Sequence, residues 1–263
     1  NFSGSYGFAL ILRDKNYLFV DGRYTLQAKL QCGKIFQIIT IPNKLPSDIL
    51  KNKKVKIGFD PKLHTKKMLR VFFNNTKSEL IPINQNLVGK LKNQKENNNI
   101  KKFYILPKKA IGQSYVTKIN KLVGILKNKK ISLQFLTASE NIAWLLNIRG
   151  QDSSFTPMPN SYLAIDNNKK VNLFCDLRKV DSSFKKKFKN IKIIDIKNTS
   201  LFLSKIRNKN ILIDSSSCSV YFENILKKNN KITGFLDPVY FLKAIKSKVE
   251  IKNTIQSHIY DGA

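Results

Sequence analysis

The stretch "FALILRDKNYLFVDGRY" (residues 8–24) indicates the architecture of the chain, because its plan returns in the second half of the sequence. Its two apolar runs flank the turn-forming "RDKN", which predicts a β-hairpin, and an acid, a glycine and an arginine follow the second run. The stretch "YLAIDNNKKVNLFCDLRKV" (residues 162–180) again contains an apolar run, a polar turn, an apolar run, Asp, one residue and Arg. An internal repeat of this length predicts two copies of one type of domain.

The acid and the arginine of this plan occur in both copies, since Asp21 and Arg23 correspond to Asp176 and Arg178. A single copy would be compatible with an acid–base pair that acts on a substrate. Gly22 does not recur, however, and a feature of both copies is more typical of a fold than of one active site. We therefore interpret the four charged residues as structural pairs that end a strand and start the next helix.

Strand-like and helix-like segments alternate along the whole chain, which predicts an α/β fold in which mixed sheets are flanked by helices. The most polar stretch, residues 85–105, is interpreted as a loop that leads into a helix over residues 112–130. The chain has 263 residues, a length that favours two medium domains.

The repeat and the alternation together set the expected domain boundaries. Residues 1–129 are predicted to form the first domain, residues 130–242 the second, and residues 243–263 a linker and a further helix.

The formal net charge is +31, and an excess of this size can indicate a nucleic-acid partner. The lysines are instead spread over the chain together with many Asn and Ile residues, a mixture that AT-rich codons also produce. The basic stretches lack interleaved aromatic residues and the motifs of nucleic-acid-binding domains. These observations argue against nucleic-acid binding and leave it as the least favoured alternative.

The pattern of cysteines and apolar runs indicates a cytoplasmic protein without a membrane partner. Cys32, Cys175 and Cys218 are odd in number and widely separated, so that we expect free thiols, mostly buried, in a reducing compartment. No apolar run approaches the ~20 residues that cross a bilayer, and the first residues lack the features of a signal peptide.

The sequence contains no pattern for a metal or a catalytic group. His64 and His258 are too few and too far apart for a catalytic zinc site. The most unusual stretch is "SENIAWLLNIRGQDSSFTPMP" (residues 139–159), which contains the only tryptophan, Trp144, followed by Arg149 and Asp152.

Two interpretations of that stretch stay open. Gly150 is expected to end the helix in a left-handed turn, and the prolines that follow would stiffen the loop. Trp144, Arg149 and Asp152 would then either line a peptide-binding cleft or lie at a domain interface.

Three motifs together resemble a known family. They are "NFSGSYGFALIL…YLFVDGRYTLQA", "ENIAWLLNIRGQDSSFTPMPNSYLAI…LFCDL" and "LKAIKSKVEIKNTIQSHIYDGA". In this order they are similar to the N-terminal two-thirds of the three-domain Xaa-Pro aminopeptidases, or aminopeptidases P, of the creatinase/prolidase group. Creatinase and prolidase usually have one such N-terminal domain, so the second copy here favours the aminopeptidase.

The resemblance implies two similar creatinase N-terminal-type domains, the first without its start, and then only the first helix of a "pita-bread" catalytic domain. That domain binds two divalent metal ions, commonly manganese, which activate a water molecule against the peptide bond that precedes a proline in second position. By this resemblance the present chain contains no metal ligand and no catalytic residue and is inactive alone.

The resemblance further implies that this part supports dimerisation and controls the access of such peptides in a homodimeric enzyme. The alternative is a stand-alone, non-catalytic interaction module.

Overall fold

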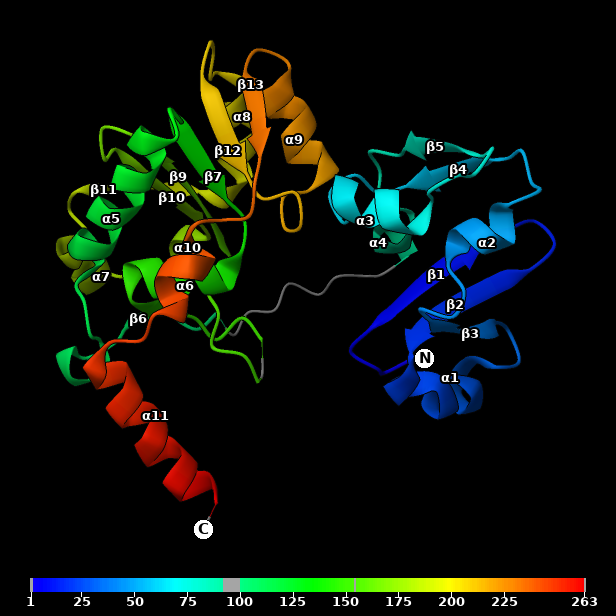
Figure 1. Ribbon diagram of the computed structural model, residues 1–263, viewed down its shortest axis with the longest axis horizontal. Helices are drawn as coiled ribbons and strands as arrows, with labels where there is room; N and C mark the ends of the chain where they lie inside the picture. The colour runs from blue at the N-terminus through cyan, green and yellow to red at the C-terminus, as the bar shows by residue number, and fades with distance from the viewer. Residues whose placement is uncertain (1, 92–99, 154, 263) are drawn as a thin grey trace. The chain divides into compact units, whose positions relative to one another are not determined.

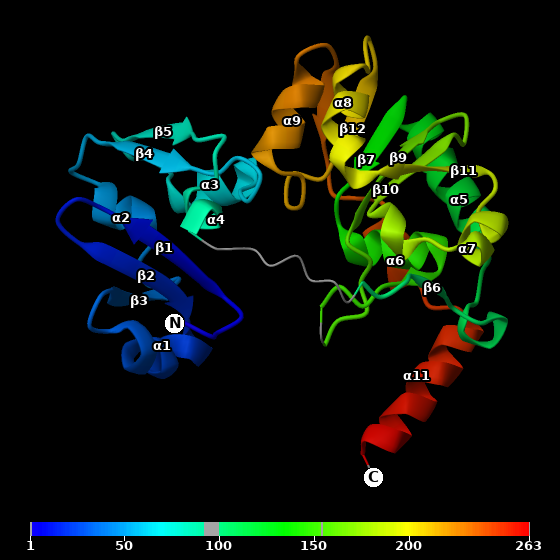
Figure 2. The same ribbon diagram turned by 180° about the vertical axis from the view of Figure 1, so that it is seen from behind.

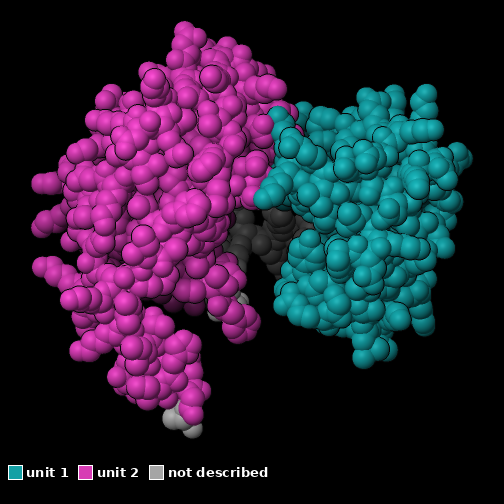
Figure 3. Space-filling view, in the orientation of Figure 1, with its two compact units in different colours: residues 1–86 teal, residues 87–263 magenta. Residues whose placement is uncertain are grey.

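The computed structural model describes residues 2–91, 100–153 and 155–262, and the chain divides into two compact units (Figures 1 and 3). Unit 1 comprises residues 1–86 and unit 2 comprises residues 87–263. Both contain mixed β-sheets flanked by helices, which confirms the predicted α/β class.

Unit 1 begins with the predicted hairpin. Its elements are, in chain order, β1 (Gly7–Ile11), β2 (Asn16–Asp21), α1 (Thr25–Cys32), β3 (Gln37–Ile41), α2 (Pro46–Leu50), β4 (Lys56–Phe59), α3 (Lys66–Phe72) and β5 (Glu79–Pro82). Strand β2 lies between β1, which is antiparallel to it, and β3, which is parallel to it, while β4 and β5 form a separate parallel pair.

Helix α1 and helix α3 supply apolar side chains to the core of unit 1. Ala28 of α1 is fully buried and packs with Leu18 and Val20 of β2. The ring of Phe8 on β1 meets the ring of Phe72 on α3 at a centroid distance of 5.0 Å. Leu18 and Val20 therefore point from one face of the hairpin to α1, and Phe8 points from the other face to α3. This is expected because successive side chains of a strand point to opposite faces.

Unit 2 is built around a longer sheet. Its elements are α4 (Leu87–Leu91), β6 (Tyr104–Ile105), α5 (Tyr115–Asn128), β7 (Leu133–Leu136), α6 (Ser139–Leu146), β8 (Ile148–Arg149), β9 (Ser161–Asp166), β10 (Val171–Cys175), α7 (Ser182–Lys187), β11 (Ile191–Asp195), α8 (Thr199–Ser204), β12 (Asn210–Ile213), α9 (Val220–Lys227), β13 (Lys231–Gly234), α10 (Val239–Ala244) and α11 (Lys248–Asp261). Among the described strands the order in this sheet is β11-β10-β9-β7-β12-β13.

Helices cover both faces of this sheet (Figures 1 and 2). Helices α5, α6, α7 and α10 contribute to one apolar cluster with one set of strand residues, and α8 and α9 contribute to a second cluster with the other set. Burial on both faces explains why the central strands β7 and β10 are mostly apolar on both sides, with single buried polar residues at Gln134 and Asn172. All five residues of β10 are buried.

The division between the units differs from the boundary expected at residues 129–130. Helix α5 belongs to unit 2, because its buried face, which includes Leu122 and Leu126, packs in the larger core of that unit. The stretch 85–105 contains α4 and β6, and its central residues 92–99 lie outside the described part of the chain.

The three cysteines are free thiols. Cys175 and Cys218 are fully buried, whereas Cys32 is half-buried. Burial is the main cause that raises the pKa of the Cys175 thiol to about 12, and the charge of the nearby Asp176 carboxylate acts in the same direction. Within the described residues, no helix is long and apolar enough to cross a membrane.

The core position of α5 leads to a stability prediction. Replacing the fully buried Leu122 with Ala should lower the free energy of unfolding of unit 2 by about 2–5 kcal/mol, because a cavity remains in a close-packed core. The control Val116→Ala on the same helix, where Val116 is 48% exposed, should change it by less than about 0.5 kcal/mol. Trp144, the only tryptophan, lies in unit 2, so urea unfolding followed by its fluorescence measures this unit alone. Equal losses in the free energy of unfolding for the two substitutions would contradict the packing of Leu122 in the core of unit 2.

Candidate functional site

The predicted acid–arginine pairs have the same geometry at two strand ends. At the end of β2, the Asp21 carboxylate accepts a hydrogen bond from the backbone N–H of Arg23 at 3.0 Å and a second from its Nη2 at 2.6 Å. After β10, the Asp176 carboxylate accepts the corresponding bonds from Arg178 at 2.9 and 2.8 Å. A single 3-10 turn follows each aspartate.

These contacts favour a capping role for the aspartates. The hydrogen bond from the arginine side chain is the main cause that lowers the pKa of Asp21 and of Asp176. The arginines are largely exposed, so each ion pair adds little stability. Asp195 at the end of β11 caps its turn in the same way, through the backbone N–H of Lys197 at 2.9 Å. An aspartate at the end of a strand therefore caps the following turn even where no arginine pairs with it. A structural role for the two Asp–Arg pairs remains our interpretation.

The side chain of Trp144 on α6 lies against a buried lysine. Lys118 of α5 places its Nζ 4.0 Å from the centre of the indole ring. The same Nζ donates to the Trp144 carbonyl at 2.8 Å and to Asn147 Oδ1 at 2.6 Å. Two hydrogen bonds and the face of an aromatic ring thus surround a cation that is only 3% exposed.

Asn147, and not Gly150, ends α6. Asn147 adopts the left-handed conformation with φ of 57°, which asparagine tolerates better than most residues. The prediction that Gly150 forms this turn was wrong, because no glycine with positive φ occurs in the described residues. Gly150 is required for a different reason. A Cβ atom there would approach the Met158 carbonyl oxygen and Pro159 Cα to 2.8 Å.

The electrostatics of Lys118 follow from its position. Burial lowers the pKa of its ammonium group from 10.5 to about 8. The negative charge of Glu250 opposes this change and the positive charge of Arg149 adds to it. Lys118 is therefore close to losing its proton at mildly alkaline pH.

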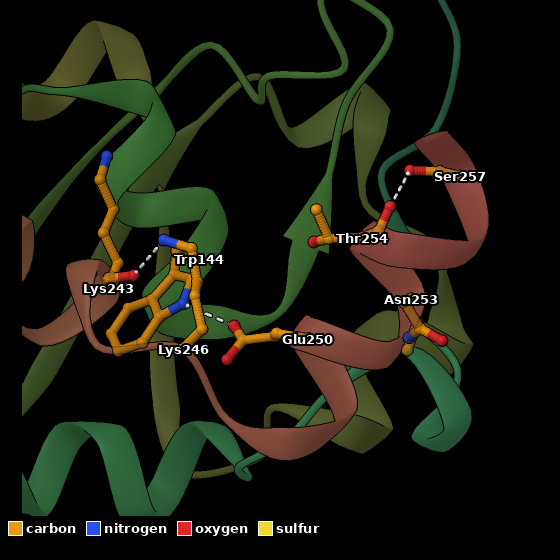
Figure 4. Close-up of a pocket in the computed structure, with 8 residues that line it drawn as sticks. Trp144, Lys243, Lys246, Glu250, Asn253, Thr254 and Ser257 are labelled. Atoms are coloured by element: carbon orange, nitrogen blue, oxygen red, sulfur yellow. Dashed lines mark hydrogen bonds between the residues drawn. The ribbon is translucent and has the colours of Figure 1, made fainter. Parts of the chain in front are cut away.

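Glu250 connects this cluster to α11 (Figure 4). Its Oε1 accepts a hydrogen bond from Trp144 Nε1 at 3.2 Å. Its Oε2 accepts from the backbone N–H of Ser247 at 2.8 Å, and Ser247 Oγ accepts from the backbone N–H of Glu250, which completes a capping box. Burial acts to raise the pKa of Glu250, but these hydrogen bonds and the charge of Lys118 lower it below its ordinary value.

A cleft of about 490 Å³ lies beside this contact. Its lining residues are Ala110, Trp144, Lys243, Lys246, Glu250, Asn253, Thr254 and Ser257. Lys243 donates from its Nζ to Asn141 Oδ1 at 2.7 Å, and Asn253 donates to the Lys109 carbonyl at 3.1 Å. Most of these residues are polar or charged, and the cleft lies where the first turns of α11 join the body of unit 2.

Arg149 and Asp152 contact other partners than Trp144. Arg149 donates from Nη1 to two main-chain carbonyls, those of Ala143 at 3.2 Å and Ile148 at 2.8 Å. The Asp152 carboxylate accepts from the Asn160 backbone N–H and forms an ion pair with Lys179. The contact of Trp144 with α11 lies within unit 2, and both interpretations left open by the sequence, a peptide-binding cleft and a domain interface, stay predictions.

Four residues of this cluster were not predicted from the sequence: Lys118, Asn147, Ser247 and Glu250. One signal was available, because Ser247 and Glu250 have the Ser-x-x-Glu spacing of a capping box. Lys118 is one of many lysines in the chain, and only packing distinguishes it from the exposed ones.

Residues 94–250 match the creatinase/prolidase N-terminal domain family, a span of more than half the chain. The chain belongs to this family. The first unit of this family member lies entirely outside the matched residues, and most of the second unit lies within them.

Several curated relatives extend over the whole of this creatinase/prolidase-family chain. A "Probable Xaa-Pro aminopeptidase P" of Laccaria bicolor is 32% identical, and the alignment covers 100% of this chain and 43% of that protein. The "Xaa-Pro aminopeptidase ApepP" of Drosophila melanogaster is 30% identical, with coverage of 99% and 45%. The chain therefore spans less than half the length of these relatives.

A solved structure shows the same fold. The X-prolyl aminopeptidase of Caenorhabditis elegans, described as a cytosolic enzyme with a di-nuclear active site, superposes with a TM-score of 0.86 at 23% identity. The superposition covers 98% of this chain and 45% of the enzyme. Both units of the chain are thus included in the similarity.

The lowered pKa of Lys118 predicts a pH effect on stability. The unfolded chain keeps a pKa near 10.5 and the folded chain about 8, so between these values the unfolded state binds more protons and stability rises with pH. The urea midpoint of the natural chain should increase relative to that of Lys118→Met between about pH 7.5 and about pH 9.5. The difference between the two proteins removes the contributions of other groups, such as Cys175. A constant difference would contradict the burial of a charged Lys118.

The contact between Gly112 and α11 predicts a local effect. A Cβ atom at Gly112 would overlap the side chain of Ser247, so Gly112→Ala should displace the capping box. We expect hydrogen exchange of the amides in the first two turns of α11 to become about tenfold faster. Gly124→Ala is the matched control, since a Cβ atom there meets nothing within 4 Å and should stabilise α5 by about 0.5–1 kcal/mol. Unchanged exchange in Gly112→Ala would show that this contact does not hold α11.

Proposed function

We propose that the full-length protein is a cytoplasmic, metal-dependent Xaa-Pro aminopeptidase, a hydrolase that removes the N-terminal residue before a proline. Residues 1–263 are then its non-catalytic N-terminal part. The observation that carries this proposal is the combination of full coverage of this chain with coverage of 43% of an aminopeptidase relative. The family match and the fold similarity support it.

The described residues do not fit a site for two divalent ions. No group of three or more His, Cys, Asp or Glu side chains that could hold a metal ion occurs among them. The His64 Nδ1 atom lies 2.8 Å from the Asp60 carbonyl oxygen, and Asp21 and Asp176 cap turns. The proposal therefore assigns the two metal ions, manganese by family resemblance, and all catalytic groups to a further domain of the full-length protein.

Helix α11 is the element through which unit 2 would act on that domain. Its start is fixed by Trp144 and Glu250, while Ile251, Ile255 and Ile259 are between 48% and 58% exposed. A spacing of four residues places these isoleucines on one side of the helix. We propose that this side packs against the catalytic domain, and that unit 2 holds α11 at a fixed angle. In this arrangement the N-terminal domains support a homodimer and control the access of peptides.

Activity measurements test the proposal. The full-length protein with manganese should release the first residue of a peptide that has proline in second position, and a chelator should abolish the release. The 263-residue chain should release none under the same conditions. Activity of the short chain would contradict the assignment of catalysis to another domain.

Two further outcomes would favour the alternatives. A stop codon directly after the codon for Ala263 would favour a stand-alone interaction module. Binding of DNA or RNA by the chain that weakens steeply as salt increases would favour the nucleic-acid hypothesis.

A further inference from the structure

Unit 2 contains a second cavity, which shares no lining residue with the cleft beside α11. It lies among β6, the start of α5 and the end of α7, and its volume is about 340 Å³. Sites for small ligands have volumes of about 300 to 1,000 Å³. The cavity is therefore of a size for one residue of a ligand and not for a long segment.

The walls of this cavity are mainly apolar. Their apolar residues are Ile105, Leu106, Ile111, Tyr115, Leu146 and Phe188. The rings of Tyr115 and Phe188 pack at a centroid distance of 4.9 Å, and the Tyr115 hydroxyl donates to the Lys187 carbonyl at 3.4 Å. Leu146 and Phe188 are buried in the core of unit 2. The walls are thus held in place by the fold, as is usual for a site that receives an apolar group.

The charged side chains that line the cavity are both basic. They belong to Lys108 and Lys187, which are exposed, and no acidic residue is among the lining residues. Within the part of the chain that the structure describes, neither ammonium group forms an ion pair. A ligand with a negative charge next to its apolar part is therefore favoured, whereas a second ammonium group would be repelled.

Gln113 adds a requirement for a hydrogen-bond donor. Its Oε1 atom is buried and has no partner among the described residues, which is unusual for a buried acceptor. The other polar side chains of the lining are occupied, since Asn147 donates to the Gln113 carbonyl at 2.9 Å and Ser114 Oγ accepts from the Thr117 N–H at 3.1 Å. A rotation about the terminal torsion of Gln113, which is broad, would bring Oε1 to an N–H group in the cavity.

We propose that this cavity binds the C-terminal residue of a peptide that ends in an apolar side chain. The side chain occupies the apolar walls, the terminal carboxylate lies near Lys108 and Lys187, and the last peptide N–H donates to Gln113. A free amino acid fits less well, because its ammonium group would lie close to two lysines. The site goes beyond the proposed aminopeptidase function, since it involves the opposite end of a peptide and requires no catalytic domain.

Binding of a short peptide to the 263-residue chain tests the proposal. Acetyl-Ala-Ala-Leu, titrated in 150 mM NaCl and followed by NMR, should bind with a Kd of about 0.1–1 mM. It should shift the backbone amides of Gly112 and Phe188 and leave those of unit 1 unchanged. The amidated peptide acetyl-Ala-Ala-Leu-NH₂ should bind about tenfold more weakly, because it lacks the charge. Acetyl-Ala-Ala-Gly, which lacks the apolar side chain, should also bind about tenfold more weakly.

Matched lysine substitutions separate the site from general attraction of anions by the net charge of +31. Lys108→Met and Lys187→Met should each weaken binding of the acid about three- to fivefold. The controls Lys109→Met and Lys186→Met remove the same charge from exposed neighbours that do not line the cavity, and should change the Kd by less than about 1.5-fold. The preference for the acid over the amide should disappear in the Lys108→Met/Lys187→Met variant.

The donor to Gln113 is tested in the same way. Methylation of the last peptide nitrogen should weaken binding to the natural chain about fivefold, and it should have a smaller effect in Gln113→Leu, where no acceptor remains.

Three outcomes would overturn the proposal. They are equal Kd values for the acid and the amide, equal effects of the lining and control lysines, and no saturable shift of the Gly112 and Phe188 amides up to about 10 mM peptide. Because the measurement uses binding to the chain itself, its failure would leave the proposed aminopeptidase activity of the full-length protein untouched.

Discussion

The fold of unit 2 depends on the pairing of β7 with both of its neighbours. Strand β7 forms backbone hydrogen bonds with β9 on one side and with β12 on the other. It thereby joins the strands β11, β10 and β9 to the parallel pair β12 and β13 in one sheet. With the sheet continuous, α5, α6, α7 and α10 can bury one face while α8 and α9 bury the other. Unpaired groups at these positions would either remain in water or lose their hydrogen bonds in the core.

A buried cation connects this core to the last helix. Lys118 on α5 is held by Asn147 at the end of α6 and by the ring of Trp144, whose N–H in turn bonds Glu250 on α11. Three helices are thus linked through one charged group. A buried charge with few alternative partners favours a single arrangement of the helices that surround it. This supports the proposal that unit 2 holds α11 at a fixed angle.

Several features were readable from the sequence because they depend on local patterns. The repeated hairpin, the Asp and Arg at each strand end, the α/β class and the buried cysteines follow from periodicity, turn residues and side-chain polarity in short windows. The assignment of α5 to the first domain differed from the structure, since a helical pattern shows which face is apolar but not which core receives it. The end of α6 was misplaced for a similar reason. Both Asn147 and Gly150 can follow a helix, and the close approach of Met158 to Gly150 is not a property of the local sequence.

The sequence by itself determined the two-domain α/β plan, the family resemblance and the strand-end pairs, because each of these resides in residues that are near one another along the chain. The packing of distant segments sets the contact of Trp144 with Glu250, and it makes Lys118 the basic residue, among those described, that is buried against the indole ring. These features join residues far apart in the sequence. Their energetics depend on burial and on hydrogen-bond direction, which are set when distant segments pack together.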